Sequence, residues 1–254
     1  MHRMHGTKES WLAALRAEGA AFHAVVQEAD GAAPVPSCPE WTVERLTAHL
    51  GCVHAWVAEH VRRGVTSAPQ PLAELELPVP AWPETAAWAR DQYTTLLSAL
   101  DRLDPEQPAW NWAPQPKRAA FWHRRMAHET TVHRWDAQLA AGRPEPVEAK
   151  LAADGVAEVL DTWLPAGRRR GPADRHGVVH LAATDIAEEW YVRLRGAGLA
   201  LLDTDTLLDS AEPHARVAAR GTASDLLLAM WGRVPFDVLD VTGQPALLPA
   251  LRAG

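Results

Sequence analysis

A carboxylate and an imidazole lie one helical turn apart in the stretch of this chain that most clearly suggests chemistry. Glu129 and His133 fall within the run from Lys117 to Ala141, which contains neither glycine nor proline. On a helix of about 3.6 residues per turn, positions four apart share one face. Glu129 and His133 could therefore supply two ligands to one divalent metal ion.

The run differs from the zinc-protease helix, in which two histidines four positions apart form the motif H-E-x-x-H. Here His128 and His133 are five positions apart. On a helix, their side chains point about 140° away from each other. They cannot both bind one metal ion, so we expect His128 to be a flanking residue.

A third ligand would have to come from another helix, and His49 is the best candidate. It lies in the middle of an otherwise apolar helical stretch. A lone histidine in such a stretch is more often a buried core residue than a ligand. Cys52, one turn later, could also reach a metal ion on that face, whereas His54 is turned well away from His49.

Two imidazoles and one carboxylate would leave a zinc-like ion with a free coordination position. Three protein ligands plus water is the pattern of catalytic zinc, whereas structural zinc is closed by four ligands. An open site can lower the pKa of water or capture a thiol as thiolate. Asp136, one turn beyond His133, could orient the His133 imidazole. A surface ion pair, for example with Arg134, is an equal alternative for Asp136.

The composition excludes several classes of protein. With 254 residues, 47% of them hydrophobic, the chain can form one large or two medium globular domains. Two cysteines, Cys38 and Cys52, make no disulfide scaffold and favour a reducing cytoplasm. No apolar run approaches the ~20 residues of a membrane span. The net charge of -7 and a single short basic cluster, 168–170, argue against nucleic-acid binding.

Apolar periodicity predicts helices in the first two-thirds of the chain. We expect them at about 8–28, at 41–63 with Thr42 as N-cap, in a third segment that ends near Leu103, at 117–141 and at 147–164. Gly142 and Pro144 should end the fourth helix. Four main helices with long connections predict a four-helix bundle.

Beyond the arginine cluster the pattern becomes that of strands, at 177–181, 190–194, 199–203 and 215–219. A helix at 222–231, with Thr222 as N-cap, and a closing helix at 245–252 follow. The expected fold class is therefore α plus α+β. We place the helical domain at 1–168 and the small α+β domain at 169–254.

Three segments resemble signatures of the mycothiol-dependent maleylpyruvate isomerase family. They are Ser37 to Val43 with Leu46 to Gly51, then Ala127 to Asp136, and finally Arg220 to Leu228 with Trp231 to Arg233. The three occur in order, and the similarity spans essentially the whole chain. Their joint occurrence is much more specific than any one of them.

The resemblance implies a DinB-like four-helix bundle followed by a domain similar to sterol-carrier proteins. It also implies a divalent metal, typically zinc, at positions that match His49, Glu129 and His133. Arg233 is the best match to the arginine that binds the acidic substrate in this family, with Arg220 second. Capping of the preceding helix or a surface ion pair is at least as good a role for Arg233.

The family further implies mycothiol, an actinobacterial thiol, as cosubstrate of a cytoplasmic enzyme. We expect a metal-dependent isomerase or S-transferase that acts on a small electrophile, as a monomer or weak homodimer. One alternative is a zinc-water hydrolase with His128 or His54 as general base. Another is a non-catalytic DinB-like binding or stress protein. Specificity should vary in the Pro- and Trp-rich loops 67–83 and 105–116.

Overall fold

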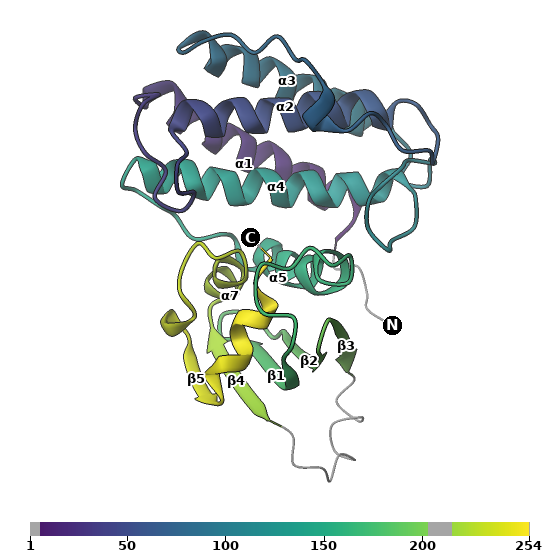
Figure 1. The fold of residues 1–254 in the computed structure, drawn as a ribbon. Coiled ribbons are helices and arrows are strands. Elements are labelled where there is room, and N and C mark those ends of the chain that lie inside the picture. Colours follow the sequence, from purple (N-terminus) through teal and green to yellow (C-terminus); the bar gives the residue numbers. More distant parts are fainter. Residues whose placement is uncertain (1–5, 203–214, 254) are drawn as a thin grey trace. The chain divides into compact units, whose positions relative to one another are not determined.

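The computed structural model describes residues 6–202 and 215–253 (Figure 1). The chain divides into two compact units, Met1–Glu145 and Pro146–Gly254. The expected fold class is confirmed, because a helical N-terminal region precedes a domain built on a five-stranded sheet. In the part of the chain just defined, no helix is long and apolar enough to cross a membrane.

Four long helices build the first unit. They are α1 (Lys8–Glu28), α2 (Val43–Val61), α3 (Glu84–Arg102) and α4 (Ala119–Ala140), with a short 3-10 helix, η1 (Leu72–Glu74), between α2 and α3. Helix α1 packs mainly against α4, and α2 mainly against α3; α1 also contacts α3, and α2 also contacts α4 (Figure 1). The contact between α2 and α4 matters most for function, because it joins the two segments that carry the candidate ligands.

Local sequence explains where these helices begin and end. The side chain of Thr42, as predicted, accepts a hydrogen bond from the backbone N–H of Arg45 at 3.3 Å. Thr7 caps α1 in the same way through the backbone N–H of Ser10. Helix α4 ends before Gly142, whose φ of 71° lies in the left-handed region that glycine adopts most easily.

The core of the first unit consists of two apolar clusters. The first includes Leu15, Val57, Leu96, Trp122 and Ala127, and the second includes Phe22, Val26, Leu46, Leu50 and Ala137. On α2, the buried His54 lies between Leu50 of one cluster and Val57 of the other. On α4, Thr130 and His133 lie between the two clusters in the same way. A layer of polar side chains therefore interrupts the apolar interior.

The second unit combines a mixed β-sheet with several helical segments. Its strands are β1 (His176–Ala183), β2 (Glu189–Arg195), β3 (Gly198–Leu202), β4 (Arg216–Gly221) and β5 (Asp240–Gly243), in the order β3-β2-β1-β4-β5. Among the strands of the described residues, β1 and β4 are parallel neighbours and the other neighbouring pairs are antiparallel. The remaining elements are α5 (Ala149–Glu158), the π-helical η2 (Val159–Trp163), α7 (Ala223–Met230), η3 (Phe236–Val238) and η4 (Pro245–Leu251).

The division between the units differs from the boundary expected near residue 168. Helix α5, which the sequence analysis grouped with the helical domain, packs against α7. The chain therefore divides after Glu145. The apolar face of α5 is visible in the sequence, but periodicity does not reveal which element covers that face.

Smaller differences have local reasons. Strand β5 is short and half polar, so it shows no alternating pattern that would predict it. The closing helix is a 3-10 helix with Pro249 inside it. The third expected strand is β3 as far as Leu202, and its last expected residue, Asp203, lies outside the described residues.

Candidate metal centre

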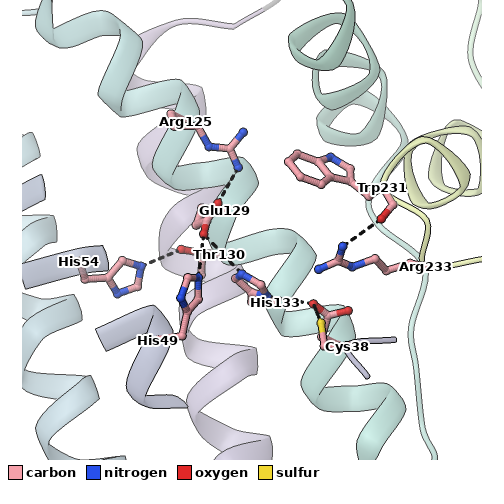
Figure 2. A network of polar contacts seen from close by, with 10 residues as sticks. Cys38, His49, His54, Arg125, Glu129, Thr130, His133, Trp231 and Arg233 are labelled. Carbon is pink, nitrogen blue, oxygen red and sulfur yellow. Dashed lines mark hydrogen bonds and ion pairs between the residues drawn. The ribbon is translucent and has the colours of Figure 1, made fainter. Parts of the chain in front are cut away.

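Three side chains from two helices converge at the polar layer (Figure 2). His49 comes from α2, and Glu129 and His133 lie one turn apart on α4. One ligand atom from each residue lies within 4.8 Å of those of the other two. Oε1 of Glu129 is 3.4 Å from Nε2 of His49 and 3.4 Å from Nε2 of His133. The structure thus brings together the three residues that the sequence analysis selected.

The spacing of these atoms fits metal coordination. Hydrogen bonds between N–H and oxygen are usually about 2.7–3.2 Å long, so 3.4 Å is long for a direct bond. Zinc bonds of about 2.0–2.2 Å at tetrahedral angles place neighbouring ligand atoms about 3.3–3.5 Å apart. Two imidazoles and a carboxylate are also a ligand set of catalytic zinc. The residues present therefore fit a divalent ion.

Neighbouring groups keep Glu129 ionised. Burial would raise the pKa of Glu129, but the neighbouring side chains of His133, His49 and Arg125 hold it well below its usual range. Nη2 of Arg125 donates to Oε2 of Glu129 at 3.0 Å. Because Arg125 occupies Oε2, the other oxygen of the carboxylate is directed at the two histidines.

Asp136 orients the His133 ring. Nδ1 of His133 donates to Oδ2 of Asp136 at 2.9 Å, which leaves Nε2 facing Glu129. Burial would lower the pKa of His133, but its hydrogen bonds to Asp136 and Glu129 raise it to about 9. Asp136 is itself fully buried and accepts hydrogen bonds from the Ser37 hydroxyl at 2.6 Å and the Cys38 thiol at 3.6 Å.

Trp41 forms an aromatic wall beside the two candidate ligands. Its ring centroid lies 4.9 Å from that of His49 and 6.2 Å from that of His133. Trp41, Ser37 and Cys38 all contact the site, although the sequence analysis assigned them no role there. They could have been suspected, because all three lie in the first family signature.

Two family domains match the chain in sequence. The mycothiol maleylpyruvate isomerase N-terminal domain matches residues 12–138, and the MDMPI C-terminal domain matches residues 150–250. The chain belongs to the mycothiol maleylpyruvate isomerase family. This result confirms the resemblance seen in the three signatures, and the N-terminal match includes all three candidate ligands.

Solved structures share the fold of this isomerase-family chain. The crystal structure of the mycothiol-dependent maleylpyruvate isomerase superposes with a TM-score of 0.65 at 13% sequence identity, covering 95% of this chain and 96% of the other. A histidine-to-alanine mutant of that isomerase gives a TM-score of 0.64 at 12% identity, with the same coverage. Identities this low support a common fold and nothing finer. A comparison with curated proteins found no match.

The other polar candidates of this family member lie apart from the converging ligand atoms. His54 is buried, and its Nε2 is 3.1 Å from Oγ1 of Thr130 (Figure 2). Burial lowers the pKa of His54 to about 3. His128 is buried on α4. Cys52 lies on α2, and burial raises the pKa of its thiol. Among the described residues, the group that could hold a metal ion contains neither His128 nor Cys52.

The arginines considered from sequence have other contacts. Arg134 forms an ion pair with Glu18 at 2.6 Å and not with Asp136 among the ion pairs of the described residues. Of the two roles considered for Asp136, its hydrogen bond with His133 supports the orientation of that imidazole. Arg233 belongs to the second unit, where its Nη1 donates to the backbone carbonyl of Trp231 at 2.9 Å, just after α7 (Figure 2). This contact is of the helix-capping kind. A substrate-binding role for Arg233 or for the exposed Arg220 stays a prediction.

Proposed function

We propose that this family member is a metal-dependent enzyme that uses mycothiol, or a similar small thiol, to isomerise or S-modify a small electrophile. The convergence of His49, Glu129 and His133 is the observation that best supports the proposal. Three protein ligands leave room for an exchangeable fourth, which a catalytic site needs. Membership in a mycothiol-linked isomerase family supports a thiol as the exchangeable group.

His49, Glu129 and His133 would hold the ion, which we expect to be zinc. When bound, it would supply Lewis acidity that lowers the pKa of a thiol or a water molecule in the site. Arg125 orients the Glu129 carboxylate and, together with His133 and His49, keeps it ionised. Asp136 keeps Nε2 of His133 directed toward the site.

The chemistry requires no oxidant or reductant. The thiol sulfur forms a bond to one carbon of an activated double bond, whose π electrons move onto the substrate's electron-withdrawing group. The former double bond can then rotate, the carbon–sulfur bond breaks, and the thiol regains its proton. Isomerisation results when the thiol leaves, whereas S-transfer results when the adduct persists. The apolar ring of Trp41 would limit access of water to the reacting groups.

A hydrolase that uses water at the same site would need a general base. His54 is a poor one, because a group with a pKa of about 3 takes up protons weakly at neutral pH. Its Nε2 is also engaged with Thr130. These observations argue against His54 as the general base of a hydrolase.

Thiol dependence tests the proposal directly. Consumption of maleylpyruvate and of other small electrophiles would be followed with and without added mycothiol, in the wild type, His133→Ala and the control His180→Ala. We expect turnover only with thiol, a loss of at least about a hundredfold in His133→Ala, and little change in His180→Ala, which alters a histidine of the second unit. Equal turnover without thiol would indicate a hydrolase. Protein that binds no metal and consumes no electrophile would indicate a non-catalytic role.

A further inference from the structure

A second polar contact joins α2 to α4 beside the candidate ligands. Nε2 of His54 lies 3.1 Å from Oγ1 of Thr130, and the two residues are almost fully buried, at 1% and 0% exposure (Figure 2). Thr130 directly follows Glu129, and His54 lies five residues after His49. Five residues of helix rise only about 7.5 Å. The hydrogen bond is therefore close, on both helices, to the residues whose ligand atoms converge.

The Thr130 hydroxyl differs in direction from that of its neighbour on α4. The hydroxyl of Thr131 donates to the backbone carbonyl oxygen of Ala127 at 2.8 Å, which is a contact within the helix. The hydroxyl of Thr130 instead meets a side chain of another helix. Among the described residues, Nδ1 of His54 has no hydrogen-bond partner. The contact with Thr130 therefore provides the hydrogen bonding of this buried ring.

Helix α3 packs against the same imidazole. The ring centroids of Tyr93 and His54 are 5.9 Å apart, and the Tyr93 hydroxyl donates to the carbonyl oxygen of Leu15 on α1 at 3.1 Å. The Tyr93 ring is thus tied to α1 and restricts the orientations that are open to His54. Whether Nε2 of His54 meets Thr130 then depends on how α2 lies along α4.

A hydrogen bond can fix the register of two helices that apolar contacts leave adjustable. On α2, His54 lies between Leu50 and Val57, and apolar side chains of this kind pack without directional preference. A hydrogen bond, in contrast, weakens steeply outside a narrow range of length and angle. Setting register is the best-attested use of buried polar groups in helical assemblies. The pair of His54 and Thr130 therefore opposes sliding of α2 along α4.

The register of these helices decides whether the candidate ligands meet. Helix α4 supplies both Glu129 and His133, and their mutual placement follows from the helix itself. His49 comes from α2, and its Nε2 is 3.4 Å from Oε1 of Glu129. A functional site has to hold its groups within about 0.5 Å of the productive geometry. A slide of α2 by about 1 Å would take His49 out of this range.

We propose that the hydrogen bond between His54 and Thr130 is a positioning device, which holds His49 against Glu129 before any metal ion binds. The two residues act through the placement of α2, because neither belongs to the group of described side chains that could hold an ion. Ligands that are already assembled need little reordering when an ion enters, so the affinity is higher. The assembly itself requires no metal, whereas the gain in zinc affinity rests on the proposed function.

Zinc affinity, measured by competition with a chromophoric chelator, is the first test. Thr130→Val keeps the shape of the side chain but removes the hydroxyl, and we expect about tenfold weaker binding. Thr130→Ser keeps the hydroxyl and should bind zinc like the wild type. Thr131→Val is the matched control, because it removes a neighbouring buried hydroxyl whose hydrogen bond stays within α4. If the wild type binds zinc, equal affinities in Thr130→Val and Thr131→Val would overturn the proposal.

The double variant His54→Leu/Thr130→Val separates positioning from stability. Thr130→Val alone leaves a buried imidazole without its hydrogen bond, which destabilises the protein, whereas removal of both polar partners is close to neutral. We therefore expect the midpoint of urea unfolding to recover in the double variant while zinc binding stays about tenfold weaker than in the wild type. Recovery of zinc affinity together with stability would show that the pair only stabilises the fold, and would overturn the proposal.

Crystal structures of the metal-free proteins test the geometry directly. We expect the distance from Nε2 of His49 to Oε1 of Glu129 to increase by about 1 Å or more in Thr130→Val and in the double variant. The distance should stay near 3.4 Å in Thr131→Val. An unchanged distance in Thr130→Val and the double variant would overturn the proposal whatever the zinc affinities. A wild type that binds no zinc, with the expected displacements in the variants, would contradict the proposed function and support the positioning role.

Discussion

The imidazole of His133 and the carboxylate of Asp136 form a buried pair, with Nδ1 and Oδ2 2.9 Å apart. The two residues lie one turn apart on α4. A residue from outside this helix also holds the carboxylate, because the hydroxyl of Ser37, which precedes α2, donates a hydrogen bond to it. The orientation of His133 therefore depends on the assembled helical unit. Changes at Asp136 should act on the site through His133.

Asp136→Asn should weaken zinc binding about 10- to 100-fold while the protein stays folded. The substituted amide is a poorer acceptor for Nδ1 of His133 and no longer stabilises the donating tautomer. Competition titration with a chromophoric chelator measures the change. Asp101→Asn is a suitable control, because Asp101 is an exposed carboxylate on α3 that pairs with Arg16. Equal affinities in the wild type and Asp136→Asn would show that this pair does not tune the site.

Removal of a ligand should remove the metal. We expect His49→Ala, His133→Ala and Glu129→Gln each to lose most of the zinc that the wild type retains, because two remaining ligands bind too weakly to survive purification. Elemental analysis of protein purified without chelator gives the stoichiometry, and circular dichroism checks folding. Full zinc occupancy in all three variants would show that the metal is bound elsewhere.

The buried histidines should make the folded state sensitive to acid. Burial lowers the pKa of His23 and of His60 to about 4, below the ordinary value of 6.5. Between pH 4 and pH 6.5 the unfolded chain binds more protons at these histidines than the folded chain does. The stability that comes from keeping the two histidines neutral is therefore fully present above about pH 6.5 and is lost as the pH falls toward 4.

His23→Phe should therefore flatten the dependence of the free energy of unfolding on pH between 7 and 4. We expect the difference in the free energy of unfolding between the wild type and His23→Phe to change by about 1–3 kcal/mol as the pH falls from 7 to 4. Urea titrations at several pH values provide the curves. His176→Phe, which alters an exposed histidine, is the matched control. Parallel curves for the wild type and His23→Phe would contradict the buried, neutral state of His23.

Gly19→Ala should destabilise the first unit although alanine favours a helix. A Cβ at Gly19 would lie 2.3 Å from the Tyr93 ring, whose hydroxyl donates to the Leu15 carbonyl oxygen at 3.1 Å. Overpacking of this kind costs about 1–3 kcal/mol, against a gain of about 1 kcal/mol in helix propensity. Denaturant titration measures the net effect. With Tyr93→Leu as background the clash is relieved, and Gly19→Ala should become neutral or stabilising.

Several features of this protein could be predicted from short stretches of sequence. Thr42 caps α2 and Gly142 ends α4 as expected, because caps and positive φ depend on neighbouring backbone groups alone. The shared face of Glu129 and His133 follows from helix geometry. The three signatures indicated the family from sequence alone, and the domain matches confirmed it.

Only the tertiary structure decided between the alternatives that these local rules left open. His49, Cys52 and His54 all lie on α2, but packing against α4 brings His49 to Glu129 and turns His54 to Thr130. Asp136 took its orienting role because the chain before α2 places Ser37 and Cys38 against it. Helix α5 joined the second unit because α7 covers its apolar face. Periodicity predicts that a face will be buried, whereas the partner that buries it depends on contacts between residues far apart in the chain.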